Sequence, residues 1–286
     1  MKAHRFKFAI EKMCKVFKVG RSGYYDWLER EPSARTLENQ KAKQIIKMIY
    51  KESKGRYGSP KITEELKARG MKLSRPRVAR LMRSEGIKSI VHKKFRVVTT
   101  DSKHNYPIAD NHLNRNFKVE KPGKVWVSDI TYIRTAQGWL YLTIIMDLFD
   151  RKIIGWALSK TLTTKDTVLA AWRMALINRP LSGRLIFHSD RGVQYASYEF
   201  RNALSGKPVT QSMSRKGDCW DNAVAENFFK ILKGELVRHH RFISQDQAKS
   251  EVFQFIEIWY NRKRIHAYLG YLTPEEFGNN YFLNAA

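Results

Sequence analysis

Cysteine is scarce in this chain of 286 residues, which has only Cys14 and Cys219. Two cysteines so far apart cannot build a disulfide framework or a CxxC zinc site, and we expect both to be buried thiols. No stretch approaches the roughly 18 uninterrupted apolar residues of a membrane span, and the N-terminal residues lack the apolar core of a signal peptide. The sequence therefore indicates a cytoplasmic protein without membrane association.

Acidic residues are also few, with 27 Asp and Glu against 53 Lys and Arg, so the formal net charge is +26. Most of the excess lies in residues 1–100, where 27 basic residues face 9 acidic ones. Solubility does not require so large a charge, whereas a polyanionic partner does. With 43% hydrophobic residues the chain is globular, and its charge favours a nucleic-acid-binding protein.

Two helices in the N-terminal third have the arrangement of a helix-turn-helix. An amphipathic helix over 36–51 comes first, and a second helix is expected from Ser59, as N-cap, to Gly70. A third begins with Ser74 as its cap and places four arginines largely outward: Arg75, Arg77, Arg80 and Arg83. A solvated helical hairpin would show the same pattern, but the local charge favours DNA binding.

The composition and periodicity of the sequence change along the chain and predict four parts. Residues 1–35 form an N-terminal helical segment and 36–90 a helix-turn-helix domain. Residues 91–118 show no sustained periodicity and many turn formers, which is typical of a basic linker. Residues 119–286 are expected to form the catalytic core with a C-terminal helical tail.

Alternating and apolar runs after residue 118 predict an α/β domain. Strands are expected at 124–133, 139–149, 153–159, 185–190 and 208–213, with helices at 163–179 (Thr164 as cap), 197–205, 220–237 and 244–264. Short turns join the first three strands, and helices join the others. The pattern predicts a mixed five-stranded sheet, partly antiparallel and partly parallel, with flanking helices.

Three acidic residues stand where this fold could bring them together. Asp129 lies in the first strand with the parity of two apolar residues, and Asp190 ends the fourth strand, which can neighbour the first. Glu226 lies in the helix 220–237, whose expected inner stripe is Val224, Phe228 and Ile231, with Asn222, Glu226, Lys230 and Lys233 on the other face.

Each acid alone has an ordinary interpretation. Asp129 could end a strand, Asp190 could form an Asx turn before Gly192, and Glu226 could be a surface residue paired with lysines. Together they suit hard divalent cations, and two such ions about 3.5 to 4 Å apart catalyse phosphodiester chemistry. The three acids therefore predict a metal-dependent site acting on DNA.

Several motifs resemble the integrase core of bacterial insertion-sequence transposases of the OrfB type, relatives of retroviral integrases. They are "VSDITYI", "LTIIMDLFDRKIIGWAL", "FHSDRGVQYAS", "SMSRKGDCWDNAVAENFFKILKGEL" and "YNRKRIHAYLGYLTPEEF", preceded by a similar helix-turn-helix, "GRYGSPKI" with "SRPRVARLMRSEGI". The 35 residues between Asp190 and Glu226 match the spacing of that family. The resemblance covers about Phe6 to Phe277.

The resemblance implies specific roles and partners. Asp129, Asp190 and Glu226 match the DDE triad, Lys233 matches a basic residue near DNA, and the fold is expected to be ribonuclease H-like with two Mg²⁺ or Mn²⁺ ions. The partners it implies are element-end and target DNA, a second copy in a homodimer or larger oligomer, and a protein or fusion from an upstream reading frame, at the bacterial nucleoid. Asp218 stands where the family has Asn, which we interpret as a tolerated change.

Other residues are weaker candidates for the site. Arg262, Arg264 and His266 could contact phosphates, as we also expect of Lys230, and a solvated basic tail is the competing interpretation. Trp220 and Tyr195 could stack on a frayed base, although such aromatics more often pack in a core. His188 is expected to be structural rather than catalytic.

The sequence thus predicts a DNA transposase that cleaves 3′ ends of an insertion sequence and transfers them to target DNA. A nuclease or resolvase of the same fold, which cuts without joining, is the first alternative. A helix-turn-helix transcription regulator with a ligand-sensing domain is the second, and it leaves the spacing of the acids unexplained.

Overall fold

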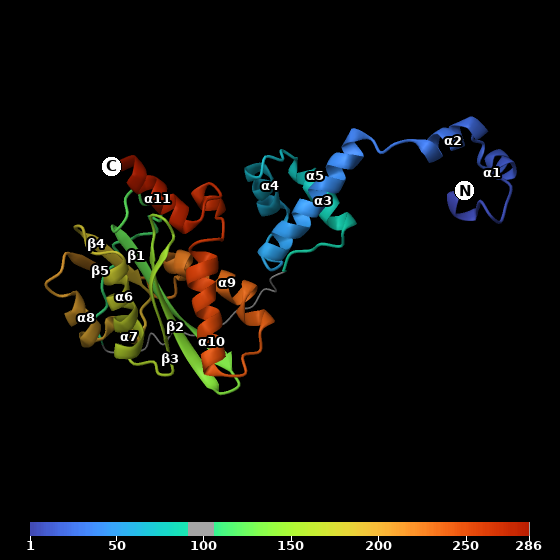
Figure 1. The fold of residues 1–286 in the computed structure, drawn as a ribbon. Helices are drawn as coiled ribbons and strands as arrows, with labels where there is room; N and C mark the ends of the chain where they lie inside the picture. Colours follow the sequence, from blue (N-terminus) through green and yellow to red (C-terminus); the bar gives the residue numbers. More distant parts are fainter. Residues whose placement is uncertain (91–105, 286) are drawn as a thin grey trace. The chain divides into compact units, whose positions relative to one another are not determined.

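The computed structural model describes residues 1–90 and 106–285, which form two compact units divided between Ser89 and Ile90 (Figure 1). Our interpretation of 91–105 as part of a linker lies outside the described residues. Cys14 is buried, as expected, and the side chain of Cys219 also lies outside the description. In the described part of the chain, every helix is too short or too polar to cross a membrane.

The first unit is entirely helical, with α1 (Ile10–Phe17), α2 (Arg21–Glu29), α3 (Ala34–Glu52), α4 (Ser59–Ala68) and α5 (Arg75–Ser84). Apolar residues at helical spacing in α3, α4 and α5 are buried against one another: Ala42, Ile46, Ile49, Ile62, Leu66, Val78, Leu81 and Met82. The expected N-cap at Ser59 is wrong, because Gly58 occupies that position and Pro60 lies in the first turn. The periodicity nevertheless located all three helices.

The second unit contains the five expected strands, β1 (Val125–Thr135), β2 (Gly138–Asp147), β3 (Ile153–Ser159), β4 (Leu185–Ser189) and β5 (Val209–Met213). They form one mixed sheet in the order β3-β2-β1-β4-β5. β1, β2 and β3 are antiparallel neighbours, whereas β4 runs parallel to both β1 and β5. The expected pairing of the first and fourth strands is confirmed.

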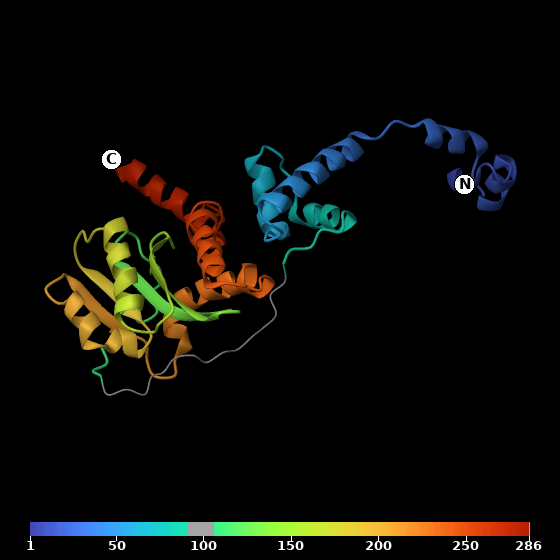
Figure 2. The ribbon, with the colours of Figure 1, turned by 60° about the horizontal axis from the view of Figure 1, so that its bottom comes forward.

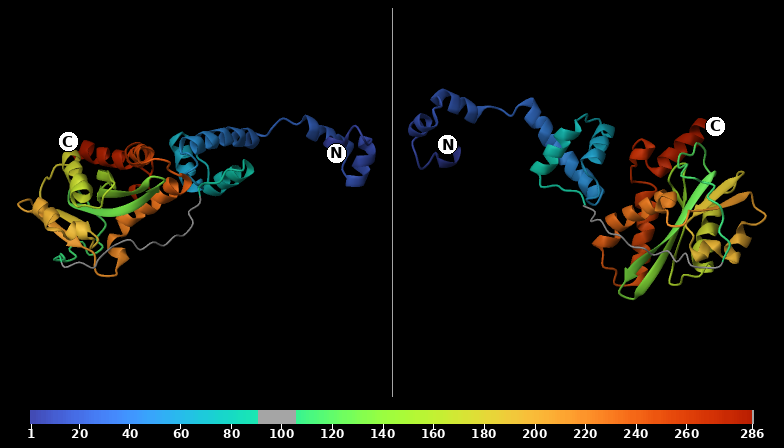
Figure 3. Two further views of the ribbon diagram at one scale, coloured as in Figure 1. Left: turned by 90° about the horizontal axis from the view of Figure 1, so that it is seen from below. Right: turned by 180° about the vertical axis from the view of Figure 1, so that it is seen from behind.

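Helices cover both faces of this sheet (Figures 1 and 2). One face carries α6 (Ala170–Asn178), preceded by a π-helical turn η2 (Lys165–Leu169), with α7 (Val193–Ala196) and α8 (Tyr198–Leu204). The other carries α9 (Ala223–Glu235) and α10 (Gln245–Phe253), which continues into the π-helical η5 (Gln254–Tyr260) before α11 (Pro274–Ala285) (Figure 3). Short 3₁₀ turns complete the chain: η1 (Lys2–His4), η3 (Cys219–Asn222), η4 (Val237–His239) and η6 (Ala267–Leu269).

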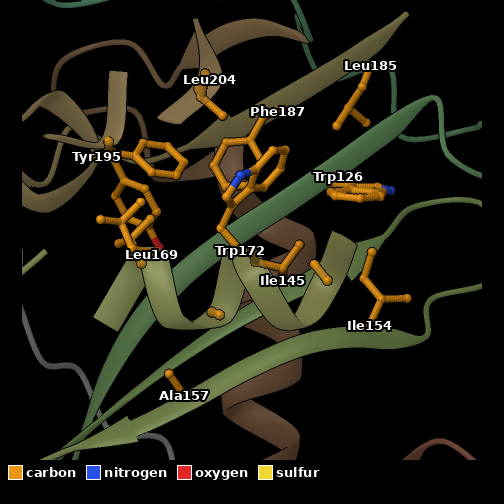
Figure 4. Close-up of a cluster of buried hydrophobic side chains, with 14 of the residues drawn as sticks. Trp126, Ile145, Ile154, Ala157, Leu169, Trp172, Leu185, Phe187, Tyr195 and Leu204 are labelled. Carbon is orange, nitrogen blue, oxygen red and sulfur yellow. The ribbon is translucent and has the colours of Figure 1, made fainter. Parts of the chain in front are cut away.

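The core between the sheet and α6–α8 is rich in aromatic residues (Figure 4). The Trp172 ring of α6 lies 5.5 Å from the rings of both Trp126 on β1 and Phe187 on β4. Such edge-on aromatic pairs contribute about 0.5–1.5 kcal/mol each beyond the area they bury. Since Trp126 and Phe187 face α6, residues of opposite parity on both strands face α9.

Residues 106–118 belong to the second unit and are not part of a linker, contrary to expectation. The backbone N–H groups of His112 and Leu113 donate to the Ser212 hydroxyl on β5, at 2.9 and 3.2 Å. Leu113 is buried, and Tyr106 packs against the aromatic core. Sequence periodicity missed this segment because it packs without forming a helix or strand.

Candidate active site

The sheet places Asp129 and Asp190 next to each other. In the parallel pairing of β1 with β4, the last paired residues are Val127 and His188, so Asp129 and Asp190 each lie two residues beyond the same paired position. Both positions have the parity that faces α9. Each carboxylate accepts one backbone hydrogen bond, Asp129 from Ile130 N–H at 2.8 Å and Asp190 from Gly192 N–H at 2.9 Å.

Helix α9 brings Glu226 to the same face, because α9 packs against β1. The Asn222 side chain, at the N-cap of α9, donates to the Ser128 carbonyl at 3.1 Å, which ties the start of the helix to the residue before Asp129. Glu226 is half-buried and lies 3.6 Å from the Lys230 ammonium. The ion pair with a lysine, which we gave as the ordinary interpretation of Glu226, is therefore observed.

The orientation of α9 differs from the expected stripe. Its buried residues are Ala225, Phe228, Phe229, Leu232, Gly234 and Glu235, whereas Val224 and Ile231 are only half-buried. The helix is thus rotated from our expectation, since two adjacent phenylalanines both pack inward. This rotation turns Glu226 and Lys233 towards the sheet rather than towards solvent.

The charges of these acids affect the pKa values within the group. Burial raises the pKa of Asp129 well above its ordinary value, and the negative charges of Asp190 and Glu226 raise it further, while Lys233 lowers it. Burial also raises the pKa of Glu226, with Asp190 adding to the rise and Lys230 opposing it. Burial lowers the pKa of Lys233. Burial is therefore the largest cause of each of these three pKa shifts, and neighbouring charges modify them.

This donor set fits hard divalent cations. Carboxylate oxygens are the ligands that Mg²⁺ and Mn²⁺ prefer. Throughout the described residues, however, no three acidic, histidine or cysteine side chains are arranged to bind one ion together. Asp129 within β1, Asp190 directly after β4 and Glu226 on α9 are therefore candidate ligands by residue type.

The arginines of the helix-turn-helix unit have different environments. Arg75, Arg80 and Arg83 are exposed. Arg77 is not turned outward as expected, because its guanidinium binds Glu38 at 2.6 Å and Asn39 at 2.8 Å and ties α5 to α3. We therefore assign Arg77 to stability instead of DNA contact.

The basic residues near the C-terminus also divide. The Arg264 guanidinium is largely buried and pairs with Glu235 at 2.9 Å. Both expectations for Arg264, a phosphate contact and a place in a solvated basic tail, are therefore wrong. His266 is buried, and its backbone N–H donates a hydrogen bond to the Leu272 carbonyl at 3.0 Å. Arg262 is exposed and lies 3.2 Å from Glu275, while Lys230 is exposed beside Glu226.

Two other candidates lie inside the core. The Tyr195 hydroxyl is 2.8 Å from the Ser128 hydroxyl behind the site, and the ring is fully buried, so it cannot stack on a base. His188 is buried between Ser212 and Ser214, at 2.9 and 3.3 Å, which agrees with its structural interpretation. Burial lowers the pKa of His188 to about 4, so this residue is neutral at physiological pH.

Sequence reasoning missed a cluster of charges next to the site, around Asp221. This carboxylate is fully buried and accepts hydrogen bonds from Asn111 (2.8 Å), Arg115 (2.8 Å) and Arg215 (2.9 Å). The two guanidiniums hold its pKa far below the ordinary value. The burial of Asp221 is the feature that would indicate such a cluster, and the sequence alone does not reveal this burial.

Asp218 belongs to the same cluster. Its carboxylate pairs with Arg115 and accepts the Trp220 N–H at 3.2 Å. The acid at this position therefore has an ionic partner, which is compatible with our interpretation of it as a tolerated change.

Known families match both units. An integrase core domain family matches residues 119–219, a second integrase core family matches 226–282, and a helix-turn-helix-like family matches 36–95. With the mixed sheet, these matches define the class of protein: a polynucleotidyl transferase with a ribonuclease H-like integrase core and a DNA-binding helical unit. Membership of the integrase core family also implies use of a divalent metal ion.

Relatives similar in sequence cover almost the whole chain. An uncharacterized 31 kDa protein of insertion element IS600 from Shigella sonnei is 41% identical over 274 residues, 96% of this chain and 100% of that protein. Transposase InsF for insertion sequence IS3A of Escherichia coli strain K12 is 38% identical over 278 residues, 96% of each chain. The chain belongs to this family of IS3-type insertion-sequence transposases, and it is a DNA transposase of the DDE class.

Solved structures similar to the chain include retroviral integrases. A chain of the simian T-cell lymphotropic virus intasome in complex with PP2A regulatory subunit B56 gamma has a TM-score of 0.48 and 14% identity, covering 76% of this chain and 70% of that one. The catalytic core domain of BIV integrase has a TM-score of 0.42 and 18% identity, covering 57% and 98%.

Proposed function

We propose that Asp129, Asp190 and Glu226 are the catalytic carboxylates of this transposase and that they hold two Mg²⁺ or Mn²⁺ ions. The observation that carries the proposal is the mutual effect of the three charges on one site between β1, β4 and α9. When bound, a pair of such cations activates an attacking oxygen and stabilises the leaving one. The protein supplies the ligands and holds them in place.

The reaction has two steps at one site. In the first, a water oxygen attacks the phosphorus at the end of the element, the P–O bond to the 3′ oxygen breaks, and a free 3′-OH remains. In the second, this 3′-OH loses its proton and attacks a target phosphodiester, whose 3′ oxygen leaves. Because every step exchanges one P–O bond for another, positioning and charge stabilisation are sufficient and no covalent enzyme intermediate is needed.

Basic residues around the carboxylates supply contacts to the DNA backbone. Lys233 lies close enough to Asp129 to affect its pKa, and Lys230 is exposed one helical turn from Glu226. Arg262 in this unit, and Arg75, Arg80 and Arg83, exposed on α5 of the first unit, are further candidates for phosphate contacts. Such contacts bind phosphates without reading sequence, so we expect DNA affinity to fall steeply with salt.

We further propose that the active species is a homodimer or larger oligomer assembled on DNA, together with an upstream-frame protein or as a fusion with it. Joining two element ends to one target requires two sites, and the relatives are transposases of insertion sequences. We place the protein in the cytoplasm at the nucleoid, in keeping with its net charge of +26.

The test compares Asp190→Asn and Glu226→Gln with Asp246→Asn, which alters a carboxylate that is 93% exposed on α10. With a pre-cut 3′-OH end and a plasmid target, we expect each site variant to lose strand transfer by at least about a hundredfold while DNA affinity stays within about twofold. The control should retain activity. Full strand transfer by either site variant refutes the triad, and cutting without joining by the wild type identifies a nuclease instead.

A further inference from the structure

Trp220 is the most exposed of the seven tryptophans, with 68% of its surface accessible. It lies in the short turn η3, between β5 and α9. Tryptophans elsewhere in the second unit, such as Trp126 and Trp172, fill the core. A large apolar ring left in water at the edge of a site indicates a ligand or partner that covers it.

The backbone on either side of this ring is held firmly. Asp218, which caps η3, pairs with Arg115 and accepts the Trp220 N–H. Asp221, on the other side, is fully buried beneath Arg115 and Arg215. The indole is therefore presented by a braced turn, and little conformational entropy is lost when something binds to it.

The turn also adjoins the carboxylates. Asn222, two residues after Trp220, donates to the carbonyl of Ser128, the neighbour of Asp129. Glu226 follows within the first turn of α9. The contacts on the C-terminal side of Trp220 thus lead directly to the groups that we assign to cleavage and joining.

Partly exposed cationic side chains lie in the same loop and on the helix that follows it. Arg215 lies in the same loop with about half of its side chain exposed, and the Lys230 side chain is 72% exposed on α9. Aromatic rings combined with cationic side chains are the equipment by which proteins bind unpaired nucleic acid, with bases stacking and phosphates neutralised. A protein partner would more often meet an apolar patch with fewer cations.

We propose that Trp220 stacks on an unpaired base of the DNA strand held at the carboxylate site. The proposal rests on the proposed function, because it assigns the substrate strand of that same site. Stacking offsets part of the cost of separating base pairs next to the scissile phosphate. The residue then selects frayed or single-stranded DNA over closed duplex.

The experiment measures equilibrium binding of the full-length chain to fluorescently labelled DNA without metal. The probes are an oligothymidylate of about 20 nucleotides and a duplex of equal length, at fixed salt. Trp220→Ala is compared with Trp220→Phe, which keeps a ring, and with Trp139→Ala, which removes a 51% exposed tryptophan from the β1–β2 hairpin.

Trp220→Ala should weaken oligothymidylate binding by about 5- to 150-fold and leave duplex binding within about twofold. Trp220→Phe should keep most of the affinity, and Trp139→Ala should match the wild type. Unchanged oligothymidylate binding by Trp220→Ala overturns the proposal. An equal loss of binding in Trp139→Ala, or an equal loss of duplex binding in Trp220→Ala, also overturns it. If Trp220→Ala loses only self-association, Trp220 is a contact between copies and the proposal is wrong.

Failure of the catalytic assignment looks different from failure of this proposal. The binding assay needs neither metal nor turnover, so it gives its result even if Asp190→Asn retains strand transfer. In the reverse case, a silent Trp220→Ala variant alongside an inactive Asp190→Asn variant would refute base stacking and leave the carboxylates in place.

Discussion

Arg179→Met should destabilise the catalytic unit strongly, because it leaves two buried acids without their cation. Arg179 follows α6, and its guanidinium binds Asp147 at 2.6 Å and Asp150 at 2.7 Å. Both carboxylate side chains are fully buried. Asp147 additionally accepts the Gly123 and Phe149 N–H groups, at 2.7 and 2.9 Å, so the cluster joins α6 to the segments flanking β1 and β2.

The size of the effect follows from this burial. Removing one partner of a buried, hydrogen-bonded ion pair costs about 3–5 kcal/mol, since an uncompensated charge remains inside. A domain is stable by only about 5–15 kcal/mol, and each kcal/mol shifts the melting temperature of a unit this large by about 2–4 °C. We therefore expect Tm to fall by about 6–20 °C.

The loss should also grow with pH. Burial raises the pKa of Asp147; the Arg179 charge opposes this rise, and the charge of Asp150 adds to it. Removing Arg179 raises the pKa further. A carboxyl whose pKa is higher in the folded than in the unfolded state stabilises the fold at low pH and loses that contribution as pH rises through the folded pKa. The Tm deficit should thus be larger at about pH 8 than at about pH 5.

Differential scanning calorimetry at the two pH values measures both effects. Arg173→Met, an exposed change on the same helix, is the matched control. Adding Asp150→Asn to Arg179→Met should recover part of the lost stability. If Arg179→Met melts together with the Arg173 control, or if its deficit shrinks as pH rises, the argument from buried charge is wrong.

Two further predictions concern the start of α9 and the helical unit. Asn222→Ala removes the hydrogen bond to the Ser128 carbonyl, so we expect kcat for strand transfer to fall at least about tenfold while DNA affinity stays nearly constant. The control Asn227→Ala changes an exposed residue of the same helix and should leave kcat unchanged. A proportional change in KM would contradict a positioning role for Asn222. Lys43 and Lys47, at 2.8 and 2.5 Å, lower the pKa of Glu85 to about 2. Helical circular dichroism should therefore show wild-type stability decreasing from about pH 4.5 to about pH 2, with a shallower loss in Glu85→Gln, and identical acid profiles would refute the link.

Much of the fold could be read from local patterns. The expected helix 244–264 begins at Ser244, whose hydroxyl accepts the Gln247 N–H at 3.1 Å; such a capping box needs only residues that are close in sequence. The five strands and the helices α3 to α5 followed in the same way from periodicity. The segment 106–118 did not, since its contacts to β5 join residues about a hundred positions apart.

For the candidate site, the sequence by itself determined the residue types, their spacing and their places on strand ends and helices. Only the tertiary structure decided that β4 lies against β1, so that Asp129 and Asp190 follow the same paired position, and that Glu226 is half-buried on α9, which packs against β1. The tertiary structure also decided that Arg77 and Arg264 form ion pairs within the protein, whereas Trp220 is exposed. Periodicity reports which face of an element is apolar, whereas pairing and burial depend on partners that the chain meets only when it folds.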